Sequence, residues 1–165
     1  MKRKINIAVI GCGVVGLRRI NNLTKNFKLV GCADPKINFL KSQILNRKKL
    51  FLTKNWKKIL VIKNLNAVII STTHNYHSKI LTECIKKNLH VLIEKPGGIS
   101  DVETKKILNI KKKIKKFIAI KVGFNHRYHP GFILAKKLIS QNKIGDLMYI
   151  RAVYGHGGRI KYNNE

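Results

Sequence analysis

The sequence predicts an α/β fold, a doubly wound parallel sheet followed by the beginning of a second, α+β domain. Three observations predict it: short apolar runs alternate with helical patterns, the first run ends in a glycine-rich turn, and Asp34-Pro35 stops the second run. Alternating strands and helices are typical of a parallel sheet with right-handed crossovers. The predicted domains cover residues 1–123 and 124–165, and the second is a truncated start.

The expected elements follow in chain order. Residues 5–10 form an almost wholly apolar run that ends in glycines, as a central parallel strand does. Asp34-Pro35 ends the second strand because proline cannot continue a ladder. In the expected last helix of the first domain, Ile107, Ile110, Ile114 and Phe117 recur at helical spacing. Strands are predicted at 5–10, 28–33, 51–53, 67–71, 90–93 and 117–122, helices at 14–24, 37–45, 77–87 and 101–116, and a helical turn at 56–62.

The pattern changes after about Gly123. His129-Pro130 opens an expected helix that runs to Gln141, and residues 147–154 are predicted to form a longer strand. This strand has no visible partner, so Leu147, Tyr149, Ala152 and Tyr154 would lie on an edge prone to pairing with other chains. We therefore expect poor solubility of the chain in isolation.

The charge is extreme, with 35 basic residues against 7 acidic ones and a net charge of +28. Such a balance raises the possibility of a nucleic-acid or membrane partner. The basic residues are mostly scattered lysines, and the densest run, 111–116, falls on the solvated face of a predicted helix without interleaved aromatic residues. A basic nucleic-acid-binding protein therefore stays the less favoured alternative. No segment reaches the roughly 18 apolar residues of a membrane span, so no membrane partner is expected.

The cysteines and the N-terminus favour a cytoplasmic protein. Cys12, Cys32 and Cys84 lack C-x-x-C spacing, so neither a metal site nor a disulfide framework is predicted. Residues 1–17 resemble a signal peptide, but the apolar stretch before Cys12 is short and Arg18-Arg19 follow it. A buried strand that runs into a glycine turn explains these letters better.

The glycine turn is a candidate phosphate site. Gly11-Cys12-Gly13-Val14-Val15-Gly16 is a G-x-G-x-x-G pattern placed after a strand and before a helix. In a Rossmann domain the first glycine permits a tight turn, the second lets a pyrophosphate approach the backbone, and the third allows close packing. The phosphates then meet the helix N-terminus. A purely structural turn is the alternative for this pattern taken alone.

Asp34, about 20 residues further on, strengthens the dinucleotide interpretation. A carboxylate here accepts hydrogen bonds from the adenosine ribose and repels a 2′-phosphate, which favours NAD over NADP. Asp34 before Pro35 is also a turn former, and the two roles are compatible. Lys36, Arg18 and Arg19 are near in sequence and would soften the preference, so NADP remains open.

Glu94-Lys95-Pro96 ends another predicted strand, where ligands bind in open α/β sheets. A lysine there can relay a substrate proton if burial lowers its pKa. Pro96 turns the chain off the sheet, and a cis bond before it would fix Lys95. A structural role explains this short string equally well when it stands alone.

Together these motifs resemble the Gfo/Idh/MocA family of NAD(P)-dependent oxidoreductases. The resemblance runs along the whole chain, and its marks are the glycine turn, Asp34, Ser71-Thr72-Thr73-His74-Asn75-Tyr76-His77, Glu94-Lys95-Pro96, Gly123-Phe124-Asn125-His126-Arg127 and Tyr154-Gly155-His156-Gly157-Gly158-Arg159. The last segment is similar to members linked to sugar or surface-polysaccharide metabolism.

The resemblance implies roles for individual residues. Lys95 would be the catalytic residue beside the nicotinamide, and Ser71, Glu94 and the loop from Thr72 to His77 would line the cofactor. Taken alone, His77 is more typical of helix capping or solvent exposure. Asn125 and Arg127 would lie where the domains meet and touch substrate or cofactor. His156 and Arg159 would contact a sugar, although exposed loop positions are equally plausible for both.

The resemblance also implies a reaction, hydride transfer between a nicotinamide and a secondary alcohol of a sugar-like substrate. Two departures qualify it: Thr73 and His74 replace the usual Pro and Asn, and the acid/base Asp/His pair of the later domain lies beyond this chain. The chain is therefore expected to bind the cofactor but to be inactive alone, whereas the full-length form is expected to be a homo-oligomer. A non-catalytic NAD(P)-binding module is the other alternative.

Overall fold

The computed structural model describes residues 4–38, 50–153 and 155. Contacts divide the chain into two units, Met1–Phe124 and Asn125–Glu165. Each unit is described by itself below.

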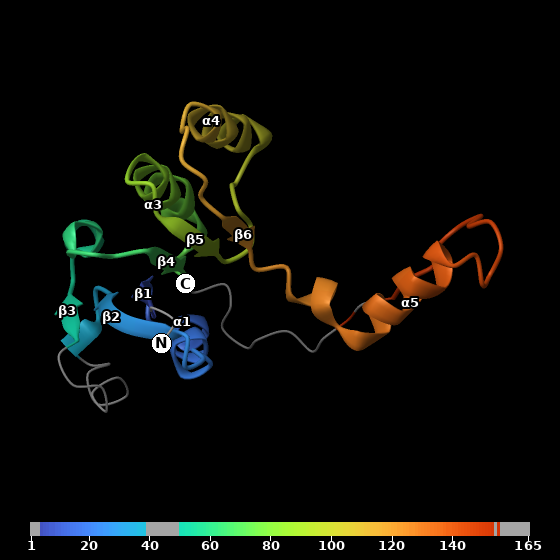
Figure 1. Ribbon diagram of the computed structural model, residues 1–165, viewed down its shortest axis with the longest axis horizontal. Helices are drawn as coiled ribbons and strands as arrows, with labels where there is room; N and C mark the ends of the chain where they lie inside the picture. Colours follow the sequence, from blue (N-terminus) through green and yellow to red (C-terminus); the bar gives the residue numbers. More distant parts are fainter. Residues whose placement is uncertain (1–3, 39–49, 154, 156–165) are drawn as a thin grey trace. The chain divides into compact units, whose positions relative to one another are not determined.

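The first unit is built on a parallel sheet, as the sequence predicts. Within the described residues the sheet has six strands in the order β3-β2-β1-β4-β5-β6, and every neighbouring pair is parallel (Figure 1). The chain order reverses between β1 and β4, which is where open α/β sheets bind ligands. The strands are β1 (Ile5–Ile10), β2 (Phe27–Ala33), β3 (Phe51–Thr53), β4 (Ala67–Ile70), β5 (His90–Ile93) and β6 (Ile120–Val122).

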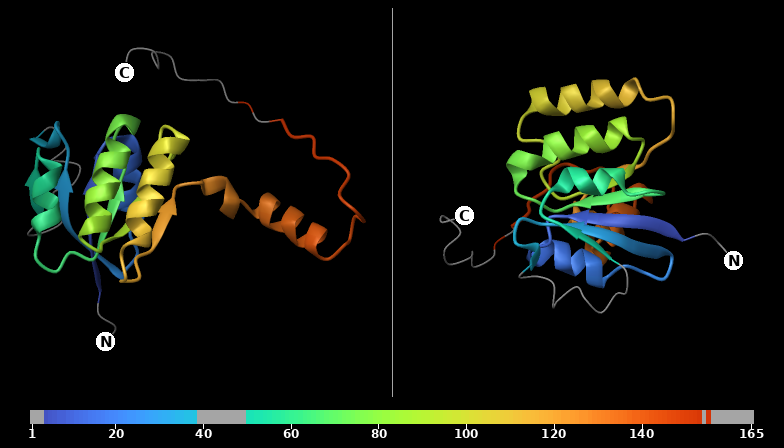
Figure 2. Two further views of the ribbon diagram at one scale, coloured as in Figure 1. Left: turned by 90° about the horizontal axis from the view of Figure 1, so that it is seen from above. Right: turned by 90° about the vertical axis from the view of Figure 1, so that its left-hand side faces the viewer.

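Helices lie on both faces of this sheet. Figure 2 shows α3 (His74–Lys86) and α4 (Asp101–Lys112) side by side on one face and α1 (Val14–Asn21) on the other. The 3-10 helix η1 (Trp56–Val61) joins β3 to β4 on the α3 side of the chain. Since α3 and α4 follow strands of one half of the sheet and α1 follows a strand of the other, right-handed crossovers place them on opposite faces.

Successive side chains of β1 point to opposite faces of the sheet and contribute to two hydrophobic clusters. Ala8 and Ile10 belong to the cluster beneath α3, whereas Ile7 and Val9 belong to the cluster beneath α1. All four are buried because successive side chains of a strand point to opposite faces and both faces are covered. This explains why the run is almost continuously apolar instead of alternating with polar residues.

Several predicted boundaries differ from the structure by a turn or less. The first helix ends at Asn21 instead of 24, and α3 begins at His74 instead of 77. The helix α4 ends at Lys112, after which tight turns bring Ile114 against the core, and β6 begins only at Ile120. Phe117, predicted on the buried side, is 79% exposed. The helix predicted at 37–45 lies largely outside the described residues.

The second unit contains η2 (Asn125–Tyr128) and α5 (Pro130–Ser140). The His129 side chain caps α5 by accepting a hydrogen bond from the Gly131 N–H at 3.2 Å, and Pro130 occupies the first turn, where its missing N–H costs nothing. The strand predicted at 147–154 was wrong for its described part, since 147–153 has no strand. Among the described residues no neighbouring segment pairs with it, and strand geometry without a paired neighbour has no ladder to hold it.

None of the described helices combines the length and the apolar character that crossing a bilayer requires.

Candidate functional site

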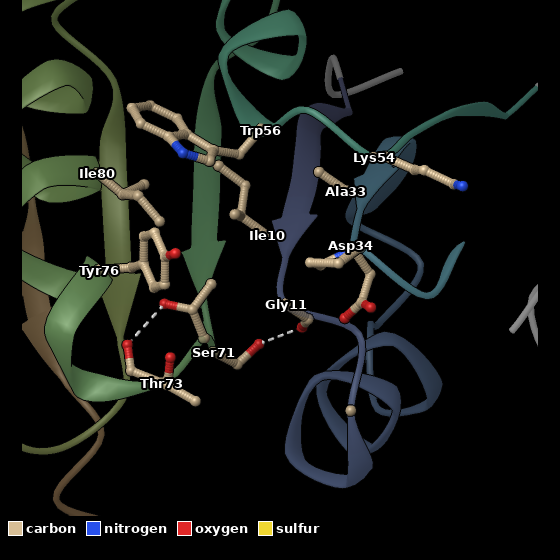
Figure 3. Close-up of a pocket in the computed structure, with 13 residues that line it drawn as sticks. Ile10, Gly11, Ala33, Asp34, Lys54, Trp56, Ser71, Thr73, Tyr76 and Ile80 are labelled. Carbon is tan, nitrogen blue, oxygen red and sulfur yellow. Dashed lines mark hydrogen bonds between the residues drawn. The ribbon is translucent and has the colours of Figure 1, made fainter. Parts of the chain in front are cut away.

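A cleft opens at the carboxyl ends of β1, β2 and β4. It has a volume of about 410 Å³, within the range of small-molecule sites. Figure 3 shows Gly11 and Asp34 on one side of it and Tyr76, Ile80 and Trp56 on the other. The residues that line it are Ile10, Gly11, Gly13, Ala33, Asp34, Pro35, Lys54, Trp56, Ser71, Thr72, Thr73, Tyr76 and Ile80.

Two glycines of the turn are required by the protein's own packing. Gly11 has a φ of +87°, and a Cβ on it would lie 2.5 Å from the Ser71 carbonyl carbon. A Cβ on Gly16 would lie 2.0 Å from the Gly11 carbonyl oxygen. The Ser71 hydroxyl donates to that same oxygen at 2.7 Å, which fixes the turn against the end of β4. The turn is therefore held rigidly by contacts inside the unit.

Gly13 differs from both. A Cβ on Gly13 would meet nothing within 4 Å, and its backbone is extended, with φ −66° and ψ −167°. Since neither packing nor conformation requires glycine here, the missing side chain leaves open space in the cleft. An approaching group of the ligand would use that space, which is the role of the second glycine in a dinucleotide site.

The helix α1 starts at this open space. Gly13 is its N-cap, and no side chain accepts a hydrogen bond from the first turn. The first N–H groups of any α-helix lack intrahelical partners, and the helix dipole is positive at that end. The backbone at Val14 and Val15 therefore presents donors to an anion, and Lys54, which lines the cleft, lies near Asp34.

Asp34 points at the glycine turn. Its Oδ2 accepts a hydrogen bond from the Cys12 N–H at 2.8 Å, and its Oδ1 accepts one from the Lys36 N–H at 2.8 Å. Because a carboxylate oxygen accepts two hydrogen bonds, each oxygen retains a site for a ligand hydroxyl. Asp34 is thus both the turn former and a polar group of the cleft.

Sequence reasoning did not single out the apolar wall of the cleft. This wall is formed by Trp56 of η1 and by Tyr76 and Ile80 of α3. Lys54 also lines the cleft, near Asp34. The signal that was available was weak: Trp56 is the only tryptophan of the chain, and Tyr76 lies inside the motif after the fourth strand. Aromatic side chains beside a carboxylate give the cleft an apolar wall and a hydrogen-bond acceptor, which suits a flat ring system that carries hydroxyl groups.

Cys12, inside the turn, is a buried thiol without nucleophilic character. A side-chain hydrogen bond with Cys32 and, next, burial raise the pKa of the Cys12 thiol above its usual range. Since the thiolate is the reactive form of cysteine, Cys12 contributes packing instead of chemistry.

A second group of predicted residues lies at the end of β5. The Lys95-Pro96 peptide bond is cis, and Lys95 is exposed within the described part of the chain. The Glu94 carboxylate does not line the cleft, because its Oε1 accepts hydrogen bonds from the Arg19 Nε at 2.7 Å and from the Arg19 Nη2.

The Arg19–Glu94 ion pair joins α1 to β5 and lies against Gly123. Both side chains are largely buried, and a Cβ on Gly123 would come within 2.8 Å of the Glu94 Oε2. Arg19 therefore interacts with Glu94, and the expectation that it softens the cofactor preference beside Asp34 finds no support. Lys36 and Lys54 line a hollow next to Pro35, and Lys54 also lines the cleft.

His77 occupies a place that neither of its expected roles describes. Its side chain is 0% exposed, and the N-cap of α3 is Thr73, so capping and solvent exposure were both wrong. The ring lies between two loops, with Nδ1 2.8 Å from the Pro96 carbonyl oxygen and Nε2 3.0 Å from the Thr72 carbonyl oxygen. It thus connects the loop after β4 with the turn that carries Lys95.

The remaining predicted residues belong to the second unit. Asn125 and Arg127 lie in η2 and are exposed, whereas His156 and Arg159 lie outside the described residues. Within the described ranges, no group of three or more His, Cys, Asp or Glu side chains has the arrangement of a metal site.

The comparisons with known proteins agree on one family. A model of an oxidoreductase family with an NAD-binding Rossmann fold, Gfo/Idh/MocA, matches residues 5–122. The chain is 24% identical over 147 residues to the uncharacterized oxidoreductase YrbE of Bacillus subtilis, covering 88% of this chain and 42% of that protein. It is 23% identical over 157 residues to an inositol 2-dehydrogenase of Corynebacterium glutamicum, covering 93% and 46%.

Solved structures show the same fold. The myo-inositol 2-dehydrogenase of Lactobacillus plantarum aligns with a TM-score of 0.77 at 23% identity, over 89% of this chain and 44% of that one. The scyllo-inositol dehydrogenase of Lactobacillus casei, solved with bound NAD(H) and scyllo-inositol, aligns with a TM-score of 0.77 at 20% identity, over 87% and 43%. The chain spans less than half the length of these relatives.

Proposed function

The chain belongs to the Gfo/Idh/MocA oxidoreductase family, and on this premise we propose that the cleft between β1, β2 and β4 binds NAD(H) as the cofactor half of a sugar-alcohol dehydrogenase. The observation that carries this proposal is the contrast between Gly13, which has open space around it, and Gly11 and Gly16, which have none. The residues present therefore fit a dinucleotide whose diphosphate approaches Gly13.

Each part of the cleft has a role in this proposal. The N–H groups of the first turn of α1 bind the diphosphate, and Asp34 accepts hydrogen bonds from the adenosine ribose while its other contacts hold the turn. Trp56 and Tyr76 provide the apolar walls for the adenine end. Ser71 fixes Gly11 by its hydrogen bond, so it acts on the cofactor through the turn.

We propose NAD as the preferred cofactor. The Asp34 carboxylate would repel the 2′-phosphate of NADP at short range. Lys36 and Lys54 oppose this effect, but both side chains are exposed, so solvent screens them more than it screens the half-buried Asp34. The net preference therefore follows the carboxylate.

When bound, the nicotinamide supplies hydride chemistry, and the protein supplies position and proton transfer. Lys95, at the carboxyl end of β5, is the residue we propose to hydrogen-bond the substrate hydroxyl and to exchange its proton through Nζ. Inositol dehydrogenases among the relatives suggest a polyol or sugar-like secondary alcohol as the substrate class. Asn125, Arg127, His156 and Arg159 are proposed substrate contacts.

Calorimetric titration tests the cofactor step directly. We expect NADH to bind the purified chain with a Kd lower than that of NADPH, and we expect Asp34→Ala to remove this difference. Absence of heat and of a thermal shift with both cofactors at millimolar concentration would refute the proposal. Dehydrogenase turnover with polyols tests the substrate class.

A further inference from the structure

His77 is the buried polar or charged side chain of the described core, and each of its ring nitrogens faces a backbone carbonyl oxygen. Nδ1 lies 2.8 Å from the Pro96 oxygen, and Nε2 lies 3.0 Å from the Thr72 oxygen. A carbonyl oxygen can only accept hydrogen bonds. Both contacts are therefore hydrogen bonds only when both ring nitrogens carry a proton.

A neutral imidazole has one N–H and one lone pair. In either neutral tautomer, one carbonyl oxygen would face that lone pair at 3.0 Å or less, where two electron-rich atoms repel each other instead of forming a hydrogen bond. The protonated ring satisfies both oxygens with charge-assisted hydrogen bonds, which are the stronger kind. The ring of the exposed His74 is a neighbour, at 5.6 Å between centroids.

The two carbonyl groups belong to the two loops that the proposed function needs. Thr72 lines the cleft at the end of β4, and Pro96 follows Lys95 in the turn at the end of β5. The side chain that joins them comes from α3, a packed helix whose buried residues fix the ring from behind. Removing the ring would free the Lys95 turn from the cofactor loop while leaving the sheet pairing of β4 and β5 in place.

We propose that His77 is a positioning residue that acts as a buried imidazolium clamp, tying the Lys95-Pro96 turn to the cofactor loop through two donated hydrogen bonds. This inference rests on the proposed function for its purpose, because a fixed Lys95 matters only if Lys95 meets a ligand. The hydrogen-bonding state of the ring is independent of any ligand and can be measured without one.

The test is a long-range ¹H–¹⁵N correlation spectrum of the uniformly ¹⁵N-labelled full chain near neutral pH. We expect protonated nitrogens at both positions of the His77 ring. His90 is the internal control, because its Nδ1 accepts the Ala119 N–H at 3.0 Å and must be unprotonated. The ring signals of His77 are assigned through correlations to the His77 backbone, so the assignment needs no substituted protein. A lone pair on either His77 nitrogen would overturn the clamp.

The positioning role is tested with His77→Gln, whose amide can donate to one of the two carbonyl groups but cannot bridge both. We expect amide chemical-shift changes at Thr73 and at Gly97 together, with Gly31 in β2 unchanged as the control for an intact sheet. Shifts confined to one loop would overturn the coupling. NADH titration of the unsubstituted chain separates the two proposals: coupled loops without NADH binding by the unsubstituted chain would refute the proposed function alone, and NADH binding by that chain with uncoupled loops would refute the clamp alone.

Discussion

Alanine substitutions at Gly13 and at Gly16 distinguish an effect on cofactor binding from an effect on folding, because each adds a single methyl group. In Gly13→Ala the added Cβ meets nothing within 4 Å, and the backbone at φ −66° is accessible to alanine. The loss of unfolded-chain entropy stabilises the variant by about 0.4–1 kcal/mol, whereas alanine at an N-cap is worse than glycine by a comparable amount. We therefore expect a free energy of unfolding within about 1 kcal/mol of the parent chain.

Gly16→Ala is the matched control because the same methyl group lands 2.0 Å from the Gly11 carbonyl oxygen. That atom is backbone, so it cannot swing away, and α1 or the turn must shift. Overpacking of this kind typically costs about 1–3 kcal/mol or more. Gly16→Ala is thus expected to unfold at clearly lower denaturant concentration, whereas Gly13→Ala is not.

Although Gly13→Ala should leave stability nearly unchanged, it should weaken NADH binding. If the diphosphate approaches the Gly13 backbone, the methyl group takes its space, and NADH affinity should fall by about tenfold or more, equivalent to about 1.4 kcal/mol. Urea unfolding followed by circular dichroism measures stability, and NADH fluorescence titration measures affinity. A Gly13→Ala variant that binds NADH like the parent chain would contradict the placement of the diphosphate, and a fully stable Gly16→Ala variant would contradict the packing.

Three further outcomes follow from other contacts. Asp34→Ala removes the acceptor for the Cys12 and Lys36 N–H groups, so it should lower stability by about 1–3 kcal/mol and NADH affinity as well; unchanged denaturation would show that these bonds are not formed. Arg19→Leu leaves the Glu94 carboxylate largely buried without its partner and should lower the denaturation midpoint, and an equal midpoint would contradict the ion pair. Burial, and secondarily the charge of neighbouring Glu83, raises the pKa of Cys84 from 9.0 to about 12. Between about pH 9 and 12 the unfolded thiol loses its proton while the folded thiol keeps it, so the Cys84 contribution to stability should decline across that window, with Cys84→Ala showing a shallower decline in alkaline melts.

Local patterns were sufficient to predict much of the fold. The run at 5–10 and the run at 90–93 were predicted with the bounds that the structure has, because the apolar residues of each strand form a short run bounded by polar residues or glycine. The glycine turn between β1 and α1 and the position of Asp34 after β2 were also predicted correctly, since both follow from patterns close in sequence.

The errors arose where the outcome depends on distant partners. The strand expected at 147–154 needs a neighbouring strand, which periodicity along one segment cannot provide, and the described part of this stretch has none. His77 was misjudged because its partner Pro96 lies 19 residues away, across the end of the sheet. Trp56 and Tyr76 were missed because lining a common cleft is a property of the packed chain.

The central strand has a consequence for cooperativity. Beyond its last residue, the Gly11 N–H bonds to the Ala33 carbonyl of β2, and the Ile10 carbonyl accepts the Ser71 N–H after β4, both at 2.8 Å. The floor of the cleft is therefore assembled from strands on both sides of β1. Unfolding of the strands on either side would remove the cleft. A ligand bound in the cleft is therefore expected to slow amide exchange in the strands on both sides of β1.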